Sequence, residues 1–129
     1  MEKLSEGLGH NFTLKNLSLV HCRIGDDGAK ALSGALKCSS IEVLDLDENR
    51  IGDRGAEALG TGLWGNISLR KLILTENRIE NVRGLSWIVK GCSALESLHL
   101  ELNPIATEEA RKIPYVDGLK ITGLWVDDN

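Results

Sequence analysis

The sequence predicts an α/β solenoid, an arc of repeated units with parallel strands on the concave face and helices on the convex face. Three observations support this prediction. A frame of spaced apolar residues recurs five times, with starts separated by 26 to 28 residues: Leu14, Ile41, Leu69, Leu95 and Ile121. Every frame carries Asn or Cys at its ninth position. Between frames, the spacing of apolar residues changes from that of a strand to that of a helix.

Within each frame, apolar residues occupy the first, fourth and sixth positions, and the first four frames also carry one at the eleventh. The fourth and sixth face inward from a short strand, and the first packs from the turn before it. The ninth position holds Asn49, Asn77 and Asn103 in three frames. Because backbone amides lose their ladder partners where the chain leaves the strand, we expect these amide side chains to form a buried ladder. Cys22 fills the same position with a weaker S–H donor.

The segments 25–36 and 52–63 align residue for residue and carry apolar residues at helical spacing. They predict amphipathic helices, with Asp26 and Asp53 as N-caps. The segment 80–94 lacks the same run but keeps enough apolar residues for a helix of uncertain start. In the segment 106–120, Thr107 is the expected cap, and Pro114 ends the helix early.

The frames divide the chain into repeats. We expect the end of a preceding repeat at 1–13, repeats at 14–40, 41–68, 69–94 and 95–120, and the start of a fifth frame at 121–129. All of 1–129 then forms one repeat domain. Because solenoids need polar closing elements, we expect a fragment of a longer horseshoe whose uncapped ends can associate end to end.

Composition limits the classes of partner. The net charge of -4 disfavours nucleic acid, and no apolar run or leader-like N-terminus predicts a membrane span or secretion. The three cysteines recur at repeat positions, so we expect buried, unpaired thiols and a cytoplasmic location. We interpret the glycosylation sequons, including the one at Asn66, as chance matches.

The repeats resemble a known family. The unit length, the Asn or Cys position, and the runs 36–41 and 49–59 are similar to leucine-rich repeats of the ribonuclease-inhibitor subtype, especially those in the tails of NOD-like receptors. The resemblance implies a horseshoe and a non-enzymatic protein-interaction module in a larger regulatory or innate-immune receptor-like protein. The subtype also includes ribonuclease inhibitors, Ran GTPase-activating proteins and tropomodulins, so fold alone leaves the function open.

The free positions of the frames define a candidate surface. Acidic residues dominate them, with isolated apolar and aromatic side chains. The predicted partner-binding residues are Asp45, Asp47, Glu48, Ile73, Glu76, His99, Glu101, Trp125 and Asp127. One interpretation is that they only solvate an exposed face. The other is that they attract a protein partner with a basic surface, and that His99 and Trp125 anchor it. Trp64 and Trp87 are expected in core or convex packing.

Two further functions remain as alternatives. A GTPase-activating role would need a catalytic Arg or Asn, and Arg23, Arg50 and Arg78 recur too regularly to single one out. A structural spacer in a longer solenoid needs no site at all. Catalysis, cofactors and metals find no support, because Asp45 and Asp47 belong to an open surface and the histidines are dispersed.

Overall fold

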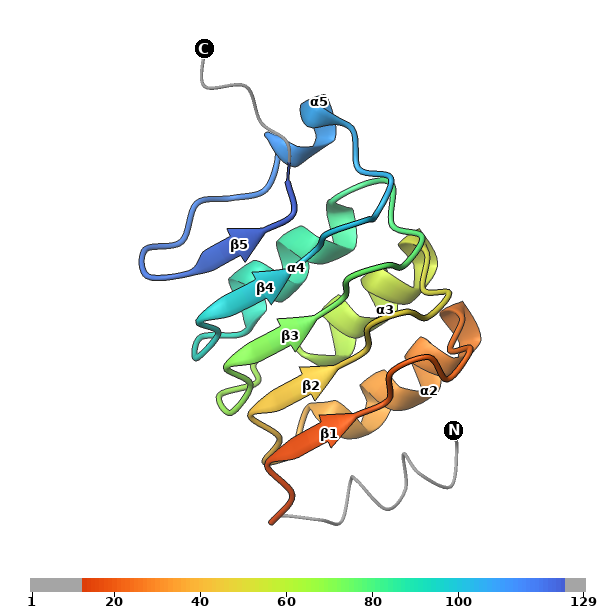
Figure 1. Ribbon diagram of the computed structural model, residues 1–129. Coiled ribbons are helices and arrows are strands. Elements are labelled where there is room, and N and C mark those ends of the chain that lie inside the picture. The colour runs from red at the N-terminus through yellow and green to blue at the C-terminus, as the bar shows by residue number, and fades with distance from the viewer. Residues whose placement is uncertain (1–12, 125–129) are drawn as a thin grey trace.

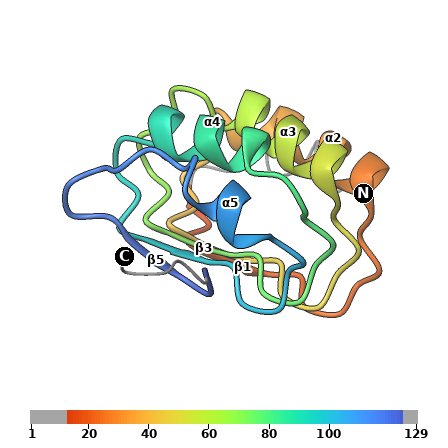
Figure 2. The ribbon, with the colours of Figure 1, turned by 90° about the horizontal axis from the view of Figure 1, so that it is seen from above.

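The computed structural model describes residues 13–124. Their strands form one parallel sheet in the order β1-β2-β3-β4-β5, and helices cover one of its faces (Figures 1 and 2). The strands are β1 (Asn16–Ser18), β2 (Val43–Asp45), β3 (Lys71–Ile73), β4 (Ser97–His99) and β5 (Lys120–Thr122). The helices are α2 (Asp26–Leu36), α3 (Asp53–Gly62), α4 (Arg83–Gly91) and α5 (Thr107–Ala110). The predicted α/β solenoid is confirmed.

The core lies between the sheet and the helices. The fourth-position residues Leu44, Leu72 and Leu98 pair in register across neighbouring strands and are fully buried. Leucines of the helices, such as Leu59 and Leu85, close the core from the other side. Burying each such side chain contributes about 2 kcal/mol. Stacking identical positions in this way fixes which residues of each strand face the opposite, open side of the sheet.

The predicted asparagine ladder is present. Asn77 Nδ2 donates to the carbonyl oxygens of Leu46 (3.0 Å) and Leu74 (3.1 Å), and its Oδ1 accepts from the Ile51 amide at 2.9 Å. The equivalent asparagines one repeat away on either side make the same pattern of bonds. Each amide side chain therefore joins its own repeat to the preceding one at the bend after the strand.

The prediction that Asp26 and Asp53 cap their own helices is wrong. The N-cap residues of α2 and α3 are glycines that make no side-chain cap bond. Asp26 Oδ1 instead accepts from the amides of Gly52 (2.7 Å) and Gly55 (2.9 Å), at the start of the helix in the next repeat. Asp53 bonds in the same way to two amides before α4. These carboxylates therefore stabilise the following helix start.

A second repeated polar position lies after the helices. Asn66 is 2% exposed, and its Nδ2 donates to the carbonyl oxygen of Leu36 at 2.9 Å, at the end of the preceding helix. Cys92 occupies the same position one repeat later, and its Sγ lies 3.6 Å from the Leu63 carbonyl oxygen. Because the Asn66 side chain is buried and bonded, its sequon offers no accessible amide nitrogen in the folded chain.

Only one of the three cysteines matches the expected burial. Cys92 is buried, and desolvation raises the pKa of its thiol to about 11, so it stays protonated. Cys22 and Cys38 are free but exposed, which contradicts the prediction of buried thiols. Cys22 Sγ bonds to the Val20 carbonyl oxygen in its own turn at 3.4 Å.

The last repeat departs from the predicted frame. Ile121 pairs with Leu98 and Thr122 pairs with His99, so Ile121 takes the fourth position and not the first. The cause is the short α5, which leaves fewer residues to cross back to the sheet. Thr107 begins α5 but makes no cap bond, because the N-cap is Ala106. In residues 13–124, no helix is long and apolar enough to cross a membrane.

The ladder makes a testable contribution to stability. Replacing Asn77→Ala leaves the buried Ile51 amide without a partner. The carbonyls of Leu46 and Leu74 keep Asn49 and Asn103 as donors, so we expect the free energy of unfolding to fall by about 2 kcal/mol. Chemical denaturation measures this change. Asn77→Cys should lose less stability than Asn77→Ala, since Cys22 occupies the same position in the first frame. The control Arg78→Ala, at an exposed neighbour, should change stability by less than about 0.5 kcal/mol. A loss below about 1 kcal/mol for Asn77→Ala would contradict the role of the ladder.

Candidate functional site on the open face of the sheet

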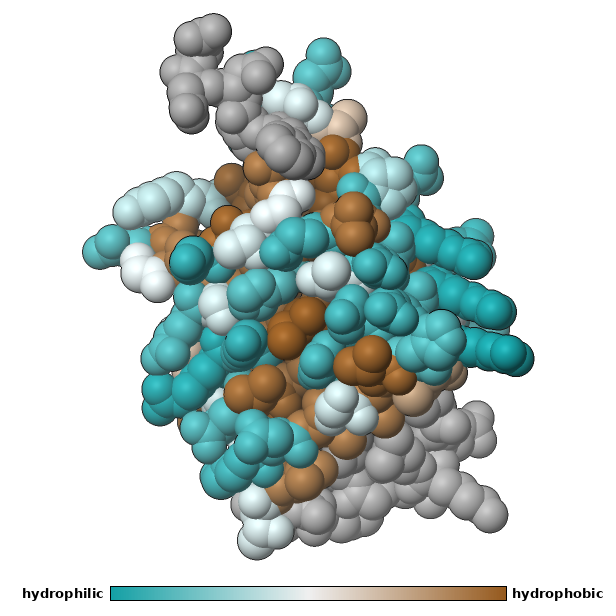
Figure 3. Space-filling model, viewed as in Figure 1, coloured by the Kyte–Doolittle hydropathy of each residue, from teal (hydrophilic) through white to brown (hydrophobic). Residues whose placement is uncertain are grey.

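The open, concave face of the sheet is lined by two rows of side chains that stack from strand to strand. The fifth-position row consists of Ser18, Asp45, Ile73, His99 and Thr122, which pair in register. The seventh-position row follows two residues later in each repeat and consists of Val20, Asp47, Thr75 and Glu101. Figure 3 shows this face, with hydrophilic side chains interleaved with isolated hydrophobic ones.

Three of the predicted acidic residues gather around Asp47. Burial, followed by the negative charges of Asp45, Glu48 and Glu101, raises the pKa of Asp47 above its ordinary value. Its backbone amide donates to Asp45 Oδ1 at 3.0 Å, which orients the neighbouring carboxylate. Asp47 Oδ1 itself is buried and has no hydrogen-bond partner in the described chain. The centre of the acidic cluster is therefore an unsatisfied acceptor.

A short chain of hydrogen bonds links the two rows at the fourth repeat. His99 Nδ1 lies 3.0 Å from Thr122 Oγ1, and that hydroxyl lies 2.8 Å from Glu101 Oε1. A hydroxyl has one proton, so both bonds form when Nδ1–H donates to Thr122 and Thr122 donates to Glu101. In the neutral imidazole, His99 Nε2 is then an acceptor, and it is buried without a partner in the described chain.

Glu101 is held in its charged form by this chain. Burial alone would raise its pKa, but the hydrogen bond from Thr122, backbone hydrogen bonds and the nearby His99 together lower the pKa below its ordinary value. Half-buried Ile73 lies between Asp45 and His99 in the fifth-position row. The centre of the face thus combines an apolar side chain with carboxylates and two unsatisfied acceptors.

Glu48 and Glu76 lie at the edge of this face, although the charge of Glu48 still acts on Asp47. Both lie where the chain leaves the strand, with left-handed backbones at φ 55° and 54°. Their side chains line a shallow groove of about 450 Å³ along the edge of the sheet, together with arginines of three repeats: Arg23, Arg50 and Arg78. Glu48 Oε2 also lies 3.2 Å from His21 Nδ1. The predicted acidic stripe is therefore split between an uncompensated centre and a charge-balanced edge.

At the opposite edge of the sheet, acidic and basic side chains also balance each other. Arg70 lies between Glu42 (3.3 Å) and Glu96 (3.0 Å), and Lys15 lies 3.8 Å from Glu42. These exposed pairs contribute little to stability. Their effect on the site is to confine the net negative charge to the fifth-position and seventh-position rows.

Sequence reasoning missed Thr122, because the fifth frame was placed three residues too late. Thr122, and not Trp125, stands beside His99 in the fifth-position row. Trp125 and Asp127 lie outside the described residues. The signal that identifies the true register is Pro114, since an early helix end shortens the repeat.

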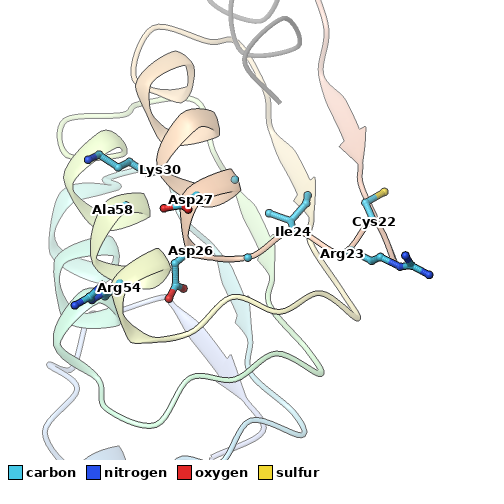
Figure 4. A pocket seen from close by; sticks show the side chains of 10 residues that line it. Cys22, Arg23, Ile24, Asp26, Asp27, Lys30, Arg54 and Ala58 are labelled. Atoms are coloured by element: carbon cyan, nitrogen blue, oxygen red, sulfur yellow. The ribbon is translucent and has the colours of Figure 1, made fainter.

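A cavity of about 920 Å³ lies at the first repeat between the turn at Cys22 and the starts of α2 and α3 (Figure 4). Its charged side chains are of both signs, including Asp26, Lys30 and Arg54. Of the two acids that line the cavity, Asp26 and Asp27, Asp26 is already bonded to two backbone amides. Among residues 13–124, no group of three His, Cys, Asp or Glu side chains is arranged to hold a metal ion.

The crowding at Asp47 predicts a pH-dependent effect on stability. Because folding raises the pKa of Asp47, its ionised form destabilises the fold above that pKa, and the penalty disappears as pH falls below the unfolded value. We expect Asp47→Asn to raise the free energy of unfolding at neutral pH by roughly 0.5 kcal/mol, with a smaller gain in acid. Denaturation across the pH range measures this. Asp27→Asn, at an exposed position, is the matched control; equal gains in both variants would refute the explanation.

The hydrogen bond from the Thr122 hydroxyl to Glu101 predicts a second pH-dependent effect on stability, opposite in sign to that of Asp47. Because folding lowers the pKa of Glu101, its charged form stabilises the fold at neutral pH, and this contribution is lost as pH falls through the folded pKa. Thr122→Val should raise the pKa of Glu101, followed by NMR titration, and should cost about 1 kcal/mol at neutral pH and less in acid. Thr75→Val, in the next row, controls for loss of a hydroxyl. An unchanged Glu101 titration would contradict the assigned bond.

Comparisons with known proteins agree with this geometry. A family model described as "Leucine Rich repeat" matches residues 10–33 and 37–60. A solved structure of the leiomodin-1 actin-binding site 2 (ABS2) is similar with a TM-score of 0.70 and 25% identity, over 85% of this chain and 64% of that one. The chain thus spans less than two thirds of that relative.

The Mex67:Mtr2 subunits from Chaetomium give a TM-score of 0.62 with 24% identity, over 98% of this chain and 92% of that one. Curated protein sequences yield no significant match. The repeat family model, the similar solved structures and the parallel strand order agree with one another. The described chain therefore has the fold of an α/β leucine-rich repeat solenoid.

Proposed function

We propose that this chain is a non-enzymatic protein-interaction module whose concave face binds a protein partner through basic side chains. The observation that carries the proposal is the uncompensated negative charge at the centre of this face, where burial and the charges of Asp45, Glu48 and Glu101 raise the pKa of Asp47. Like charges held close together cost free energy, and a positive charge on a bound protein lowers that cost. Lys and Arg supply such charges together with hydrogen-bond donors.

The shape of the surface supports a protein partner. A solenoid presents an extended face, and leucine-rich repeats generally serve protein–protein interaction. The similar solved structures point the same way, since one is described as an actin-binding site and the other pairs Mex67 with Mtr2. Half-buried Ile73 offers an apolar contact at the middle of the acidic rows. Apolar contacts at the centre, with charges around them, are the usual anatomy of a specific interface.

The wider setting is part of the proposal. The long repeats and the shared Asn or Cys position support the ribonuclease-inhibitor subtype and a place in a larger regulatory or receptor-like protein in the cytoplasm. A Ran-type GTPase-activating function has weaker support. The recurring arginines occupy equivalent backbone sites, where the amides of Arg50 and Arg78 donate to carbonyls of the preceding repeat. This regularity favours a role in the repeat, and stimulated GTP hydrolysis by added small GTPases would reverse that preference.

Charge reversal tests the binding face. Replacing Asp45, Asp47, Glu76 and Glu101 by Lys should reduce capture of basic partners at least tenfold, because four attractions become repulsions. The matched control replaces four exposed acids away from the face by Lys: Asp27, Glu80, Glu108 and Asp117. Quantitative mass spectrometry of captured proteins compares the two variants with the parent chain. Capture that survives on the first variant, or falls equally on both, would count against the concave face.

A further inference from the structure

A second candidate surface lies on the helix side of the solenoid, away from the open face of the sheet (Figure 2). A groove of about 460 Å³ runs there between the end of α3 and the length of α4. We name it the tryptophan groove after its two largest side chains. Its lining residues are Lys37, Gly60, Thr61, Trp64, Trp87 and Lys90.

Close packing holds both indole rings in place. A Cβ atom on Gly91 would lie 2.8 Å from Trp64 Cε3, so the ring rests directly on this glycine. The Gly65 amide donates to the Gly91 carbonyl at 2.9 Å and pins the turn that carries Trp64. On the other wall, a Cβ on Gly60 would lie 2.9 Å from Trp87 Cβ. The two glycines therefore let the tryptophan-bearing segments approach their neighbours closely.

The two tryptophans are not part of the buried core. Trp64 is 52% exposed, and Trp87 is half-buried with its ring 5.7 Å from the Arg83 guanidinium carbon. The expectation was core or convex packing, and both lie on the convex side. A half-exposed tryptophan is a common energetic centre of protein interfaces, because its ring offers a large apolar area and loses little freedom on binding.

The charge of the groove is opposite to that of the chain. Lys37 and Lys90 take part in none of the ion pairs of the described chain, whereas Lys15, Arg70 and Lys112 each face a carboxylate. Both lysines lie at helix C-terminal ends, where a positive charge is favourable. That location explains each lysine singly. It does not explain why two of them flank two exposed tryptophans in a chain of net charge -4.

We propose that the tryptophan groove binds a short acidic peptide segment of a protein partner, in which an aromatic or large aliphatic side chain is flanked by carboxylates. The apolar side chain lies against Trp64 and Trp87, and the carboxylates bond to Lys37 and Lys90. A polyanion such as nucleic acid or an anionic membrane is a poorer fit, because the overall negative charge of the chain repels it beyond the two lysines. This surface is separate from the concave face and attracts the opposite charge.

Fluorescence anisotropy with a labelled peptide Asp-Glu-Asp-Leu-Phe-Asp-Glu-Asp tests the proposal. The parent chain should bind the peptide, and changing its Leu-Phe to Ser-Ser should weaken binding at least tenfold. Trp64→Ala should also weaken binding about tenfold; because Trp64 is half exposed, circular dichroism is expected to show an intact fold. Failure of the parent chain to bind the peptide at millimolar concentration would overturn the proposal.

Charge variants provide the matched comparison. The double variant Lys37→Glu and Lys90→Glu should abolish the attraction and weaken peptide binding more than tenfold. The control variant Lys30→Glu and Lys120→Glu makes the same change of net charge elsewhere and should alter peptide binding less than twofold. Asp45→Lys with Asp47→Lys should leave groove binding intact, which separates this result from that of the concave face. Equal weakening by both lysine pairs, preferred binding of single-stranded DNA or anionic vesicles, or Trp64-dependent dimerisation in sedimentation would each refute the assigned occupant.

Discussion

The buried amide of the ninth position is the interaction on which the rest of this structure depends. Asn49, Asn77 and Asn103 each bond to their own repeat and to the one before it, at the bend where strand hydrogen bonding stops. Without these bonds, the bend would leave several backbone groups buried and unpaired. With them, consecutive repeats stack without a register offset. Because of this register, residues at equivalent positions of successive repeats form continuous rows of side chains.

The fixed direction of these side chains also brings like charges together. Asp45, Asp47 and Glu48 belong to one repeat, and the charge of Glu101, two repeats further along the seventh-position row, adds to theirs. As a result, the pKa of Asp47 is raised, and its Oδ1 has no hydrogen-bond partner in the described chain. The edges avoid this cost, because Arg70 alternates with Glu42 and Glu96. Charge compensation at the edges and not at the centre is the strongest physical reason to regard the centre as a binding surface.

The periodicity within each repeat could be predicted from the sequence, but the contacts between repeats could not. The sequence predicted the core leucines and the asparagine ladder, since both follow from spacing within one repeat. It misassigned Asp26, whose carboxylate serves amides 26 and 29 residues away, because an ordinary helix cap looks the same in sequence. It also misplaced the fifth strand, because Leu124 and the residues after it imitate the apolar frame, while Pro114 and the short α5 determine where the chain returns. Thr122 became visible only in the structure.

The solenoid separates its two charged surfaces by construction. Side chains alternate along each strand, so residues of the open rows cannot reach the helices, and the leucine core lies between them. The groove of Trp64 and Trp87 depends instead on glycines that let neighbouring segments approach closely. A partner bound to the acidic rows and one bound to the groove would therefore contact different residues of the same repeats. Because sites without shared contacts act nearly additively, one repeat array can hold two partners of opposite charge without either weakening the other.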